Sequence, residues 1–274
     1  EKLSEFRKIC KNYGLKIRED VIFQNIPKAG VPKNVLGRQN LTTTVAYGYP
    51  LNSGKKGSVH LFISKDEKLL KQGMWYPVII KNRVINQPRM DGLKYGYVLG
   101  YPDCCIKFFR KYNNWIKYSY LYRAYINTKG KPSFLCNPFL KDLSFSYIYH
   151  MPCSYSCGET SKLVTRLRKE INKREPEYVK LTDRFLKMPF LVLYERKFYC
   201  FDGELSGNEI KYKSFCFPSP DNEKDDFGRY LVQGDALRLE GRDVIFLKGN
   251  KVFKKISIKL TEFAPEHPFL IKFE

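Results

Sequence analysis

The spacing of hydrophobic positions divides the chain into three parts, of which the first is residues 1–95. A helical pattern over 1–13 ends at Gly14, and a stretch rich in breaker residues follows up to residue 40. Apolar and β-branched runs then predict strands at 41–47, 58–63 and 75–80. A short helix is predicted between the last two strands, at 66–72. We expect these elements to form a small N-terminal α/β layer.

Helical spacing dominates the second part, residues 96–188. The apolar faces predict helices over 103–112, 118–126, 162–174 and 177–188. Alternating residues at 144–149 predict a strand in the same part. Residues 189–274 instead contain short β-type runs separated by glycine turns, which is typical of a small β domain. The strands predicted there are 190–194, 197–201, 210–217, 236–239, 244–247 and 252–258. The pattern therefore predicts an α+β protein made of regions 1–95, 96–188 and 189–274.

Charge adds a class of partner to this picture only because it is unevenly distributed. The chain of 274 residues has a net charge of +21, and residues 1–200 carry 37 Lys and Arg against 15 Asp and Glu. Residues 201–274 carry 12 and 13, so they are nearly neutral. A surplus of this size attracts polyanions through counterion release. We expect a nucleic acid, RNA or transfer RNA first, with an acidic protein or an anionic membrane surface as the alternative, and a protein partner for the β domain.

Two groups of basic residues are candidates for phosphate contacts. Lys55 and Lys56 lie in a glycine-bounded turn that departs from a Walker loop, because Lys56 stands where the magnesium-binding Ser or Thr belongs. The polar face of the predicted helix 162–174 carries the second group: Arg166, Arg168, Lys169, Lys173 and Arg174. A solvated helix face has the same composition, so both interpretations stay open.

Cysteine content and the absence of export signals predict a reducing compartment. The sequence has eight cysteines, no apolar run long enough to span a membrane, and no signal-peptide pattern at its start. Clustered cysteines in such a chain are more often ligands or catalytic groups than disulfides. We therefore expect a cytoplasmic protein without a membrane span.

Two short segments hold most of the possible chemistry. The first has adjacent thiols, Cys104 and Cys105, in the first turn of a predicted helix, where Asp103 suits the positive helix end. The second has His150, Cys153 and Cys157. We expect the four cysteines to bind a metal or cluster, His150 to be a further ligand or a donor to a ligand, and Asp103 and His150 to be the candidate catalytic groups.

Several chemistries suit these ligands. A four-iron (4Fe-4S) cluster tolerates adjacent thiolates because they can reach different irons, whereas adjacent cysteines bind one zinc ion only with strain. The sequence therefore predicts an iron–sulfur cluster first and zinc second, with a metal-free redox pair as the third interpretation. A zinc deaminase is excluded because three residues separate Cys153 from Cys157 and no His-x-Glu precedes them. Other chemistry-bearing residues are interpreted as packing residues: His60, Cys10, Cys136, Cys200 and Cys216.

The motifs Gly-Tyr-Pro-x-Cys-Cys-x-x-Phe (from Gly100) and His-x-Pro-Cys-Ser-x-x-Cys-x-x-Thr (from His150) resemble those of an uncharacterised domain family found chiefly in archaea. The similarity covers residues 90–175. The paired cysteines are also weakly similar to cysteine-rich domains of heterodisulfide reductases and to iron–sulfur reductases that act on modified queuosine. The chain differs from both, since Ile106 follows the adjacent pair in place of glycine and the spaced pair has three intervening residues.

Together these features predict a cytoplasmic iron–sulfur protein that is an enzyme, or a component of one, acting on RNA. Sulfur transfer or reduction during transfer RNA modification is the expected reaction. A zinc-stapled RNA-binding module without catalysis is the first alternative, and a thiol–disulfide redox protein is the second.

Overall fold

The computed structural model describes residues 2–25, 46–72, 78–80, 83–84, 96–112, 119–194, 197–216, 226–260 and 266–274. The chain forms two compact units, Glu1–Gly100 and Tyr101–Glu274. The first boundary lies close to the expected one at residue 95. The regions expected at 96–188 and 189–274, in contrast, belong to one unit.

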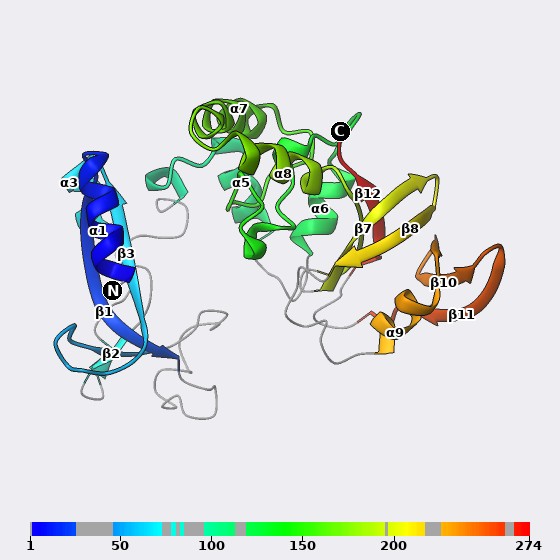
Figure 1. The fold of residues 1–274 in the computed structure, drawn as a ribbon, viewed down its shortest axis with the longest axis horizontal. Coiled ribbons are helices and arrows are strands. Elements are labelled where there is room, and N and C mark those ends of the chain that lie inside the picture. The colour runs from blue at the N-terminus through cyan, green and yellow to red at the C-terminus, as the bar shows by residue number, and fades with distance from the viewer. Residues whose placement is uncertain are drawn as a thin grey trace. The chain divides into compact units, whose positions relative to one another are not determined.

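The described residues of the first unit include a five-stranded sheet and the helices α1 and α3 (Figure 1). Its strand order is β3-β1-β2-β4-β5, in which β2 and β4 are parallel and the other neighbours are antiparallel. The elements are α1 (Lys2–Asn12), β1 (Lys16–Asn25), β2 (Ala46–Tyr49), β3 (Ser58–Ser64), α3 (Glu67–Gln72), β4 (Val78–Ile80) and β5 (Arg83–Val84).

The sequence predicted most of these elements but missed β1. The prolines and glycines that indicated a loop all lie beyond Asn25, and the ten residues Lys16–Asn25 before them form β1, which lies between β3 and β2. The strands expected at 41–47 and 75–80 lie partly outside the described residues, and their described ends belong to β2 and β4.

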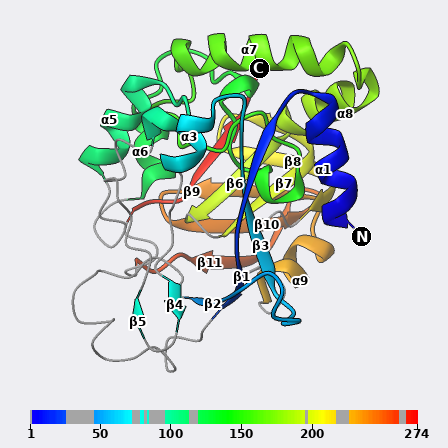
Figure 2. The same ribbon diagram turned by 90° about the vertical axis from the view of Figure 1, so that its left-hand side faces the viewer.

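The second unit begins with helices and short turns. These are α5 (Asp103–Lys111), α6 (Tyr120–Ile126), the 3-10 turns η2 (Phe134–Cys136) and η3 (Lys141–Leu143), α7 (Gly158–Asn172) and α8 (Pro176–Leu186). Helix α7 packs against α8, and both are seen along one edge of the unit in Figure 2.

The rest of the unit is a seven-stranded antiparallel sheet of order β11-β10-β9-β8-β7-β6-β12. Its elements are β6 (Pro189–Tyr194), β7 (Lys197–Ser206), β8 (Glu209–Cys216), α9 (Asp226–Gln233), β9 (Ala236–Glu240), β10 (Asp243–Lys248), β11 (Lys251–Ser257) and β12 (Phe269–Lys272). The sequence predicted the first six of these strands and missed α9 and β12.

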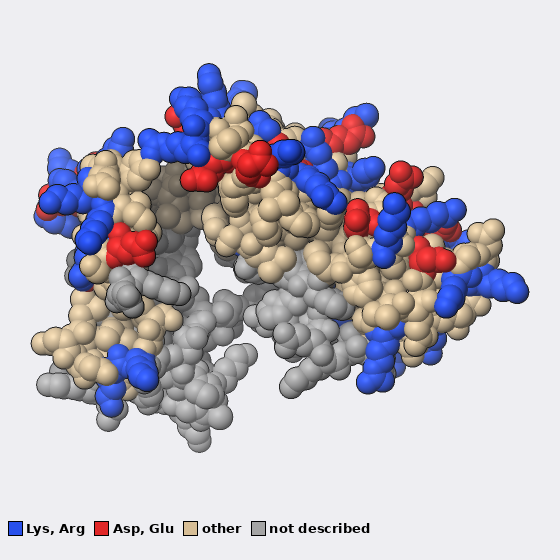
Figure 3. Space-filling model, in the orientation of Figure 1, with Lys and Arg blue, Asp and Glu red and all other residues tan. Residues whose placement is uncertain are grey.

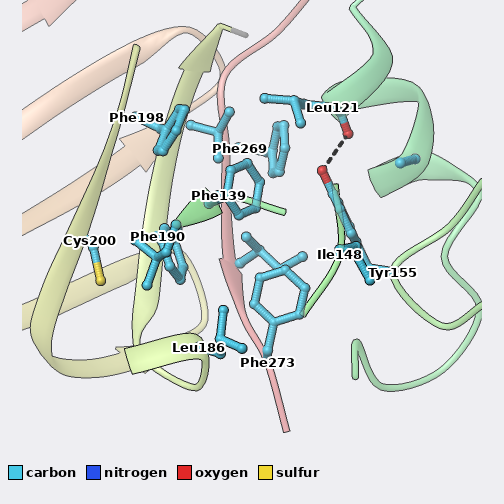
Figure 4. Close-up of a cluster of buried hydrophobic side chains, with 14 of the residues drawn as sticks. Leu121, Phe139, Ile148, Tyr155, Leu186, Phe190, Phe198, Cys200, Phe269 and Phe273 are labelled. Carbon is cyan, nitrogen blue, oxygen red and sulfur yellow. Dashed lines mark hydrogen bonds between the residues drawn. The ribbon is translucent and has the colours of Figure 1, made fainter. Parts of the chain in front are cut away.

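Helices and sheet belong together because β6 is buried on both faces. Phe190 and Val192 pack with helical residues in one cluster, whereas Leu191 and Leu193 face a second cluster that includes Phe227 of α9. Figure 4 shows the first cluster, where Phe139 and Tyr155 from the helical part meet Phe190 and Phe198 from the sheet. A strand with both faces covered cannot separate from either layer without exposing apolar surface.

The strand expected at 144–149 does not form. Ser144 has φ of 62°, a left-handed conformation that interrupts an extended run. The Ser146 hydroxyl donates to the backbone carbonyl of Asn137 and also binds the backbone of Ile148. Such local side-chain bonds satisfy backbone groups in place of a strand partner. The segment nevertheless delivers His150 to the cysteines, as described next.

Candidate metal centre

The adjacent cysteines lie in the first turn of α5. Gly100 has φ of 72°, which turns the chain before Pro102, and Pro102 is the N-cap of the helix. The amide of Cys105 donates to the Pro102 carbonyl at 2.9 Å, so the helix has begun when the two thiols leave it. Cys105 is buried and Cys104 is partly buried.

The second segment ends in α7. Cys157 is the N-cap of this helix, and its Sγ accepts a hydrogen bond from the backbone N–H of Thr160 at 3.5 Å. The sequence predicted the helix a few residues later, because serine and threonine are more usual N-caps than cysteine. Cys153 lies one turn before, and its backbone N–H donates to Cys105 Sγ at 3.4 Å. Each segment therefore supports a thiol with backbone N–H groups.

The four thiols converge. Cys104 Sγ lies 3.6 Å from Cys157 Sγ and 3.9 Å from Cys105 Sγ, and Cys105 Sγ lies 3.8 Å from Cys157 Sγ. All four sulfur atoms, including that of Cys153, lie within 4.8 Å of one another. Soft thiolate ligands in such a group suit zinc or iron. The four cysteines can hold a metal ion, as the sequence predicted.

Two helix N-termini favour negative charge at these sulfurs, because α5 and α7 both begin at the group. The hydrogen bond from Cys105 lowers the pKa of the Cys157 thiol strongly. The pKa of Cys105 is raised, chiefly by its hydrogen bonds to Cys153 and Cys157. A metal ion that binds the four cysteines would displace the protons that remain on their thiols.

His150 is linked to the thiols through one intervening side chain, that of Thr160. Its Nε2 is 3.0 Å from Thr160 Oγ1, and Thr160 Oγ1 is 3.4 Å from Cys105 Sγ. The imidazole is 6% exposed and its ring centre lies 5.0 Å from that of Tyr101. Burial lowers the pKa of His150 to about 4. Thus, of the two roles expected for His150, this contact corresponds to support of a ligand through Thr160.

Cys136 belongs to the same cluster, although the sequence indicated only a packing residue. It is completely buried, packs with the four thiols, and its Sγ donates to the Cys157 carbonyl at 3.5 Å and contacts Ser161 Oγ at 3.4 Å. Burial raises its pKa to about 11, so this thiol stays protonated. No spacing rule reveals it, because it comes from a separate turn, η2.

Tyr155 anchors the second segment, and sequence reasoning missed it. The residue stands between the two cysteines, is completely buried, and donates its hydroxyl to the Leu121 carbonyl at 3.0 Å (dashed in Figure 4). Its backbone N–H donates to Thr128 Oγ1 at 2.9 Å, and its carbonyl accepts from Ser133 N–H at 2.7 Å. A large aromatic residue between two ligands was the signal that a core anchor lay there.

Asp103, the other candidate catalytic group, pairs with Lys107 on its own helix at 2.7 Å and is half exposed. The ion pair follows the ordinary i,i+4 geometry of a helix surface. Its position at the first residue of α5 agrees with the expected interaction with the helix end.

The basic candidates fall into different settings. Arg168 is committed to a bidentate ion pair with Asp183, which also accepts from the hydroxyl of Tyr147. Lys173 pairs with Glu170 at 2.7 Å. Arg166 and Lys169 are exposed and have no ion pair within the described part of the chain. Arg174 is exposed as well, while Lys55 and Lys56 lie in an exposed turn of the first unit.

Comparisons with protein-family models, with curated proteins and with solved structures gave no match. The resemblance suggested by the two cysteine motifs stays a prediction. Among the described helices, none combines the length and apolar character needed to cross a membrane.

Proposed function

We propose that the second unit binds one zinc ion through Cys104, Cys105, Cys153 and Cys157, and that this ion fixes an RNA-binding surface on α7. The observation that carries the proposal is the spacing of the thiols. Zn–S bonds of about 2.3 Å in a tetrahedron give S···S edges of about 3.8 Å. The three sulfur pairs among Cys104, Cys105 and Cys157 are separated by 3.6, 3.8 and 3.9 Å, and Cys153 Sγ lies within 4.8 Å of each of them.

This spacing favours a single ion over the four-iron cluster that ranked first from sequence. In such a cluster each thiolate binds a different iron, which spreads the ligands farther apart than the ligands of one ion. The argument for a cluster rested on strain in the adjacent pair. In α5 both thiols leave one helical turn and approach Cys157 to within 4 Å, so the pair is compatible with one ion.

The zinc site and the basic helix are joined through Cys157. This residue would be a ligand, and it is also the N-cap of α7. Four basic residues at i, i+4, i+7 and i+11 form a stripe along the exposed side of the helix: Lys162, Arg166, Lys169 and Lys173. Figure 3 shows Lys and Arg side chains projecting over the surface where α7 lies, with a few acidic residues between them. Without the ion, the first turn of α7 would no longer be held in place, and the four basic side chains would no longer be fixed along one line.

RNA is the polyanion that the surrounding residues support best. Tyr149 is 68% exposed next to the buried His150, and Phe109 on α5 is also exposed. Aromatic rings at the surface can stack on unpaired bases, which are common in folded RNA. Catalysis, including transfer RNA modification, stays a prediction, and zinc in a closed four-cysteine site supplies stability in place of chemistry.

Metal analysis of anaerobically purified protein tests the zinc site. We expect a colourless protein with one zinc per chain, and we expect its removal by a chelator to lower the unfolding temperature of the second unit. A brown protein with iron and acid-labile sulfide would restore the iron–sulfur interpretation and overturn the zinc site.

Binding to labelled transfer RNA tests the RNA-binding surface on α7. We expect affinity to fall steeply with salt, and to fall at least about tenfold when Lys162, Arg166, Lys169 and Lys173 are all replaced by Ala, because each phosphate contact releases counterions. The matched control replaces four exposed lysines of the neutral C-terminal part: Lys213, Lys248, Lys251 and Lys259. Equal losses of affinity in the two variants would mean that binding depends only on net charge, and would contradict α7 as the RNA-binding surface. Equal affinity for duplex DNA would contradict RNA as the partner.

A further inference from the structure

Two cysteines outside the metal centre face each other across the β7–β8 hairpin. Cys200 of β7 is directly opposite Cys216 of β8 in the antiparallel register. Residues directly opposite in an antiparallel pair have Cα atoms about 4.5–5.5 Å apart. Disulfides span Cα separations of about 4.4–6.8 Å, so the backbone already has a suitable separation.

A β-bulge creates this pairing. From the hairpin turn outward, Ser206 pairs with Glu209 and Gly203 with Tyr212, but beyond the bulge Asp202 pairs with Ser214. The register shift of one residue moves every later pair, and without it Cys200 would face Phe215. Gly203 permits the bulge, because a Cβ there would lie 2.0 Å from the Lys211 carbonyl oxygen.

The pair is chemically separate from the centre formed by Cys104 and its neighbours. Cys200 is 1% exposed, lies in the apolar cluster of Figure 4, and its Sγ is 3.6 Å from Met188 Sδ. Cys216 is partly exposed near the end of β8. An oxidant can therefore reach the Cys216 thiol first, whereas the Cys200 thiol is shielded from solvent.

We propose that Cys200 and Cys216 form a reversible cross-strand disulfide by exchange with a small-molecule disulfide such as oxidised glutathione. The Cys216 thiolate attacks one sulfur of the small disulfide, which forms a mixed disulfide and releases one thiol. The Cys200 thiol then attacks Cys216 Sγ and releases the second thiol, with its own proton passing to solvent. Two protein thiols are oxidised and one small disulfide is reduced to two thiols.

The surroundings give the two thiols different roles. The neighbouring Cys200 thiol lowers the pKa of Cys216, which increases the thiolate fraction of the more exposed residue. The interaction with Cys216, together with burial, raises the pKa of Cys200. The accessible residue is thus the nucleophile and the buried residue resolves the mixed disulfide.

Peptide mapping of the full-length, metal-loaded protein tests the proposal. After treatment with oxidised glutathione and alkylation of free thiols, trypsin releases peptides 198–211 and 214–224, each with one cysteine. We expect these two peptides joined by a disulfide that dithiothreitol removes. We also expect the oxidised protein to unfold at a temperature higher by at least about 3 °C, because the link closes a loop in the unfolded chain.

Two variants separate the possible outcomes. Cys216→Ser should abolish the link and leave Cys200 reduced, whereas Cys10→Ser, which changes a buried cysteine of the first unit, should leave the link unchanged. Glutathione attached to Cys216 without closure, no reaction at either residue, or a link from Cys216 to a cysteine of the metal centre would each overturn the proposal. The wild-type map is decisive even where a variant folds poorly.

Discussion

The backbone N–H of Cys153 donates a hydrogen bond to Cys105 Sγ at 3.4 Å. This contact joins two segments that are 48 residues apart, and it does so through the sulfur that would bind the metal. This backbone N–H lowers the pKa of Cys105, and so offsets part of the rise that the neighbouring thiols cause. The folded chain therefore presents its ligands already gathered, which is the condition for a tight structural site.

The first prediction separates ligands from their neighbours. Cys105→Ala should lower zinc affinity by more than about 100-fold, because changing only a hydrogen-bond partner of a ligand typically costs about 10- to 100-fold. Cys136→Ser should fall within that smaller range, since Cys136 Sγ contacts the carbonyl of Cys157. Competition with a chromophoric chelator measures both affinities. Equal losses in the two variants would make Cys136 a ligand and contradict the four-thiol site.

The second prediction concerns pH. His150 has a pKa of about 4 in the folded metal-free protein, compared with about 6.5 when unfolded. The unfolded chain therefore takes up a proton first, so stability is complete above pH 6.5 and is lost as the pH falls toward 4. Between pH 7 and pH 5 this group should reduce the free energy of unfolding by about 2 kcal/mol.

Urea unfolding in the presence of a chelator measures this loss, and His150→Gln is the control. The variant retains a polar group facing Thr160 but has no proton to gain, so its stability should change less over the same interval. Parallel pH profiles for wild type and variant would show that the imidazole is not kept neutral.

The sequence predicted elements well where a local pattern determines them, and poorly where contacts distant in the chain do. Helix α5 and the hairpin strands β7 and β8 follow from spacing and turn residues. Strand β12 does not, because its residues Phe269 and Ile271 become strand only by pairing with β6. The expected boundary at residue 188 fails for the same reason, since β6 is apolar on both faces and needs both layers.

The candidate site was predictable as far as its ligands, but not its geometry. Motif spacing identified the four cysteines, yet it could not place Cys104 and Cys105 within 4 Å of Cys157, because that depends on two helices beginning at one point. The pairing of Cys200 with Cys216 was hidden more deeply. A regular hairpin would have placed Phe215 opposite Cys200, and a single bulge decides otherwise.

The third prediction tests the core anchor of the second cysteine segment. Tyr155→Phe removes only the hydroxyl that donates to the Leu121 carbonyl, and should lower the free energy of unfolding by about 1–2 kcal/mol. Tyr155→Ala also leaves a cavity beside Phe139 and Phe273, and should cost about 3–5 kcal/mol. Denaturant unfolding of the zinc-free protein measures both. If Tyr155→Phe were as stable as wild type, the hydrogen bond to the Leu121 carbonyl would make no net contribution to stability.

The fourth prediction separates Arg166 from Arg168, two of the three arginines that the sequence assigned together to the basic face of α7. Arg168 binds Asp183 with two parallel contacts, and Asp183 also accepts from the hydroxyl of Tyr147. Arg168→Ala leaves a mostly buried carboxylate with a single partner, so we expect the free energy of unfolding to fall by about 2 kcal/mol. Arg166→Ala should change it by less than about 0.5 kcal/mol, as is usual for an exposed side chain.

RNA affinity should reverse this order. Arg166 points to solvent in the exposed stripe, so its loss removes a phosphate contact and lowers the salt dependence of binding by about one counterion. Arg168 is only partly exposed and is held by the mostly buried Asp183 of α8, so its replacement should affect binding less once the protein is folded. Salt titrations of both variants against the same transfer RNA measure the difference. A larger binding defect in Arg168→Ala than in Arg166→Ala would place the RNA on the α7–α8 seam instead of the exposed stripe.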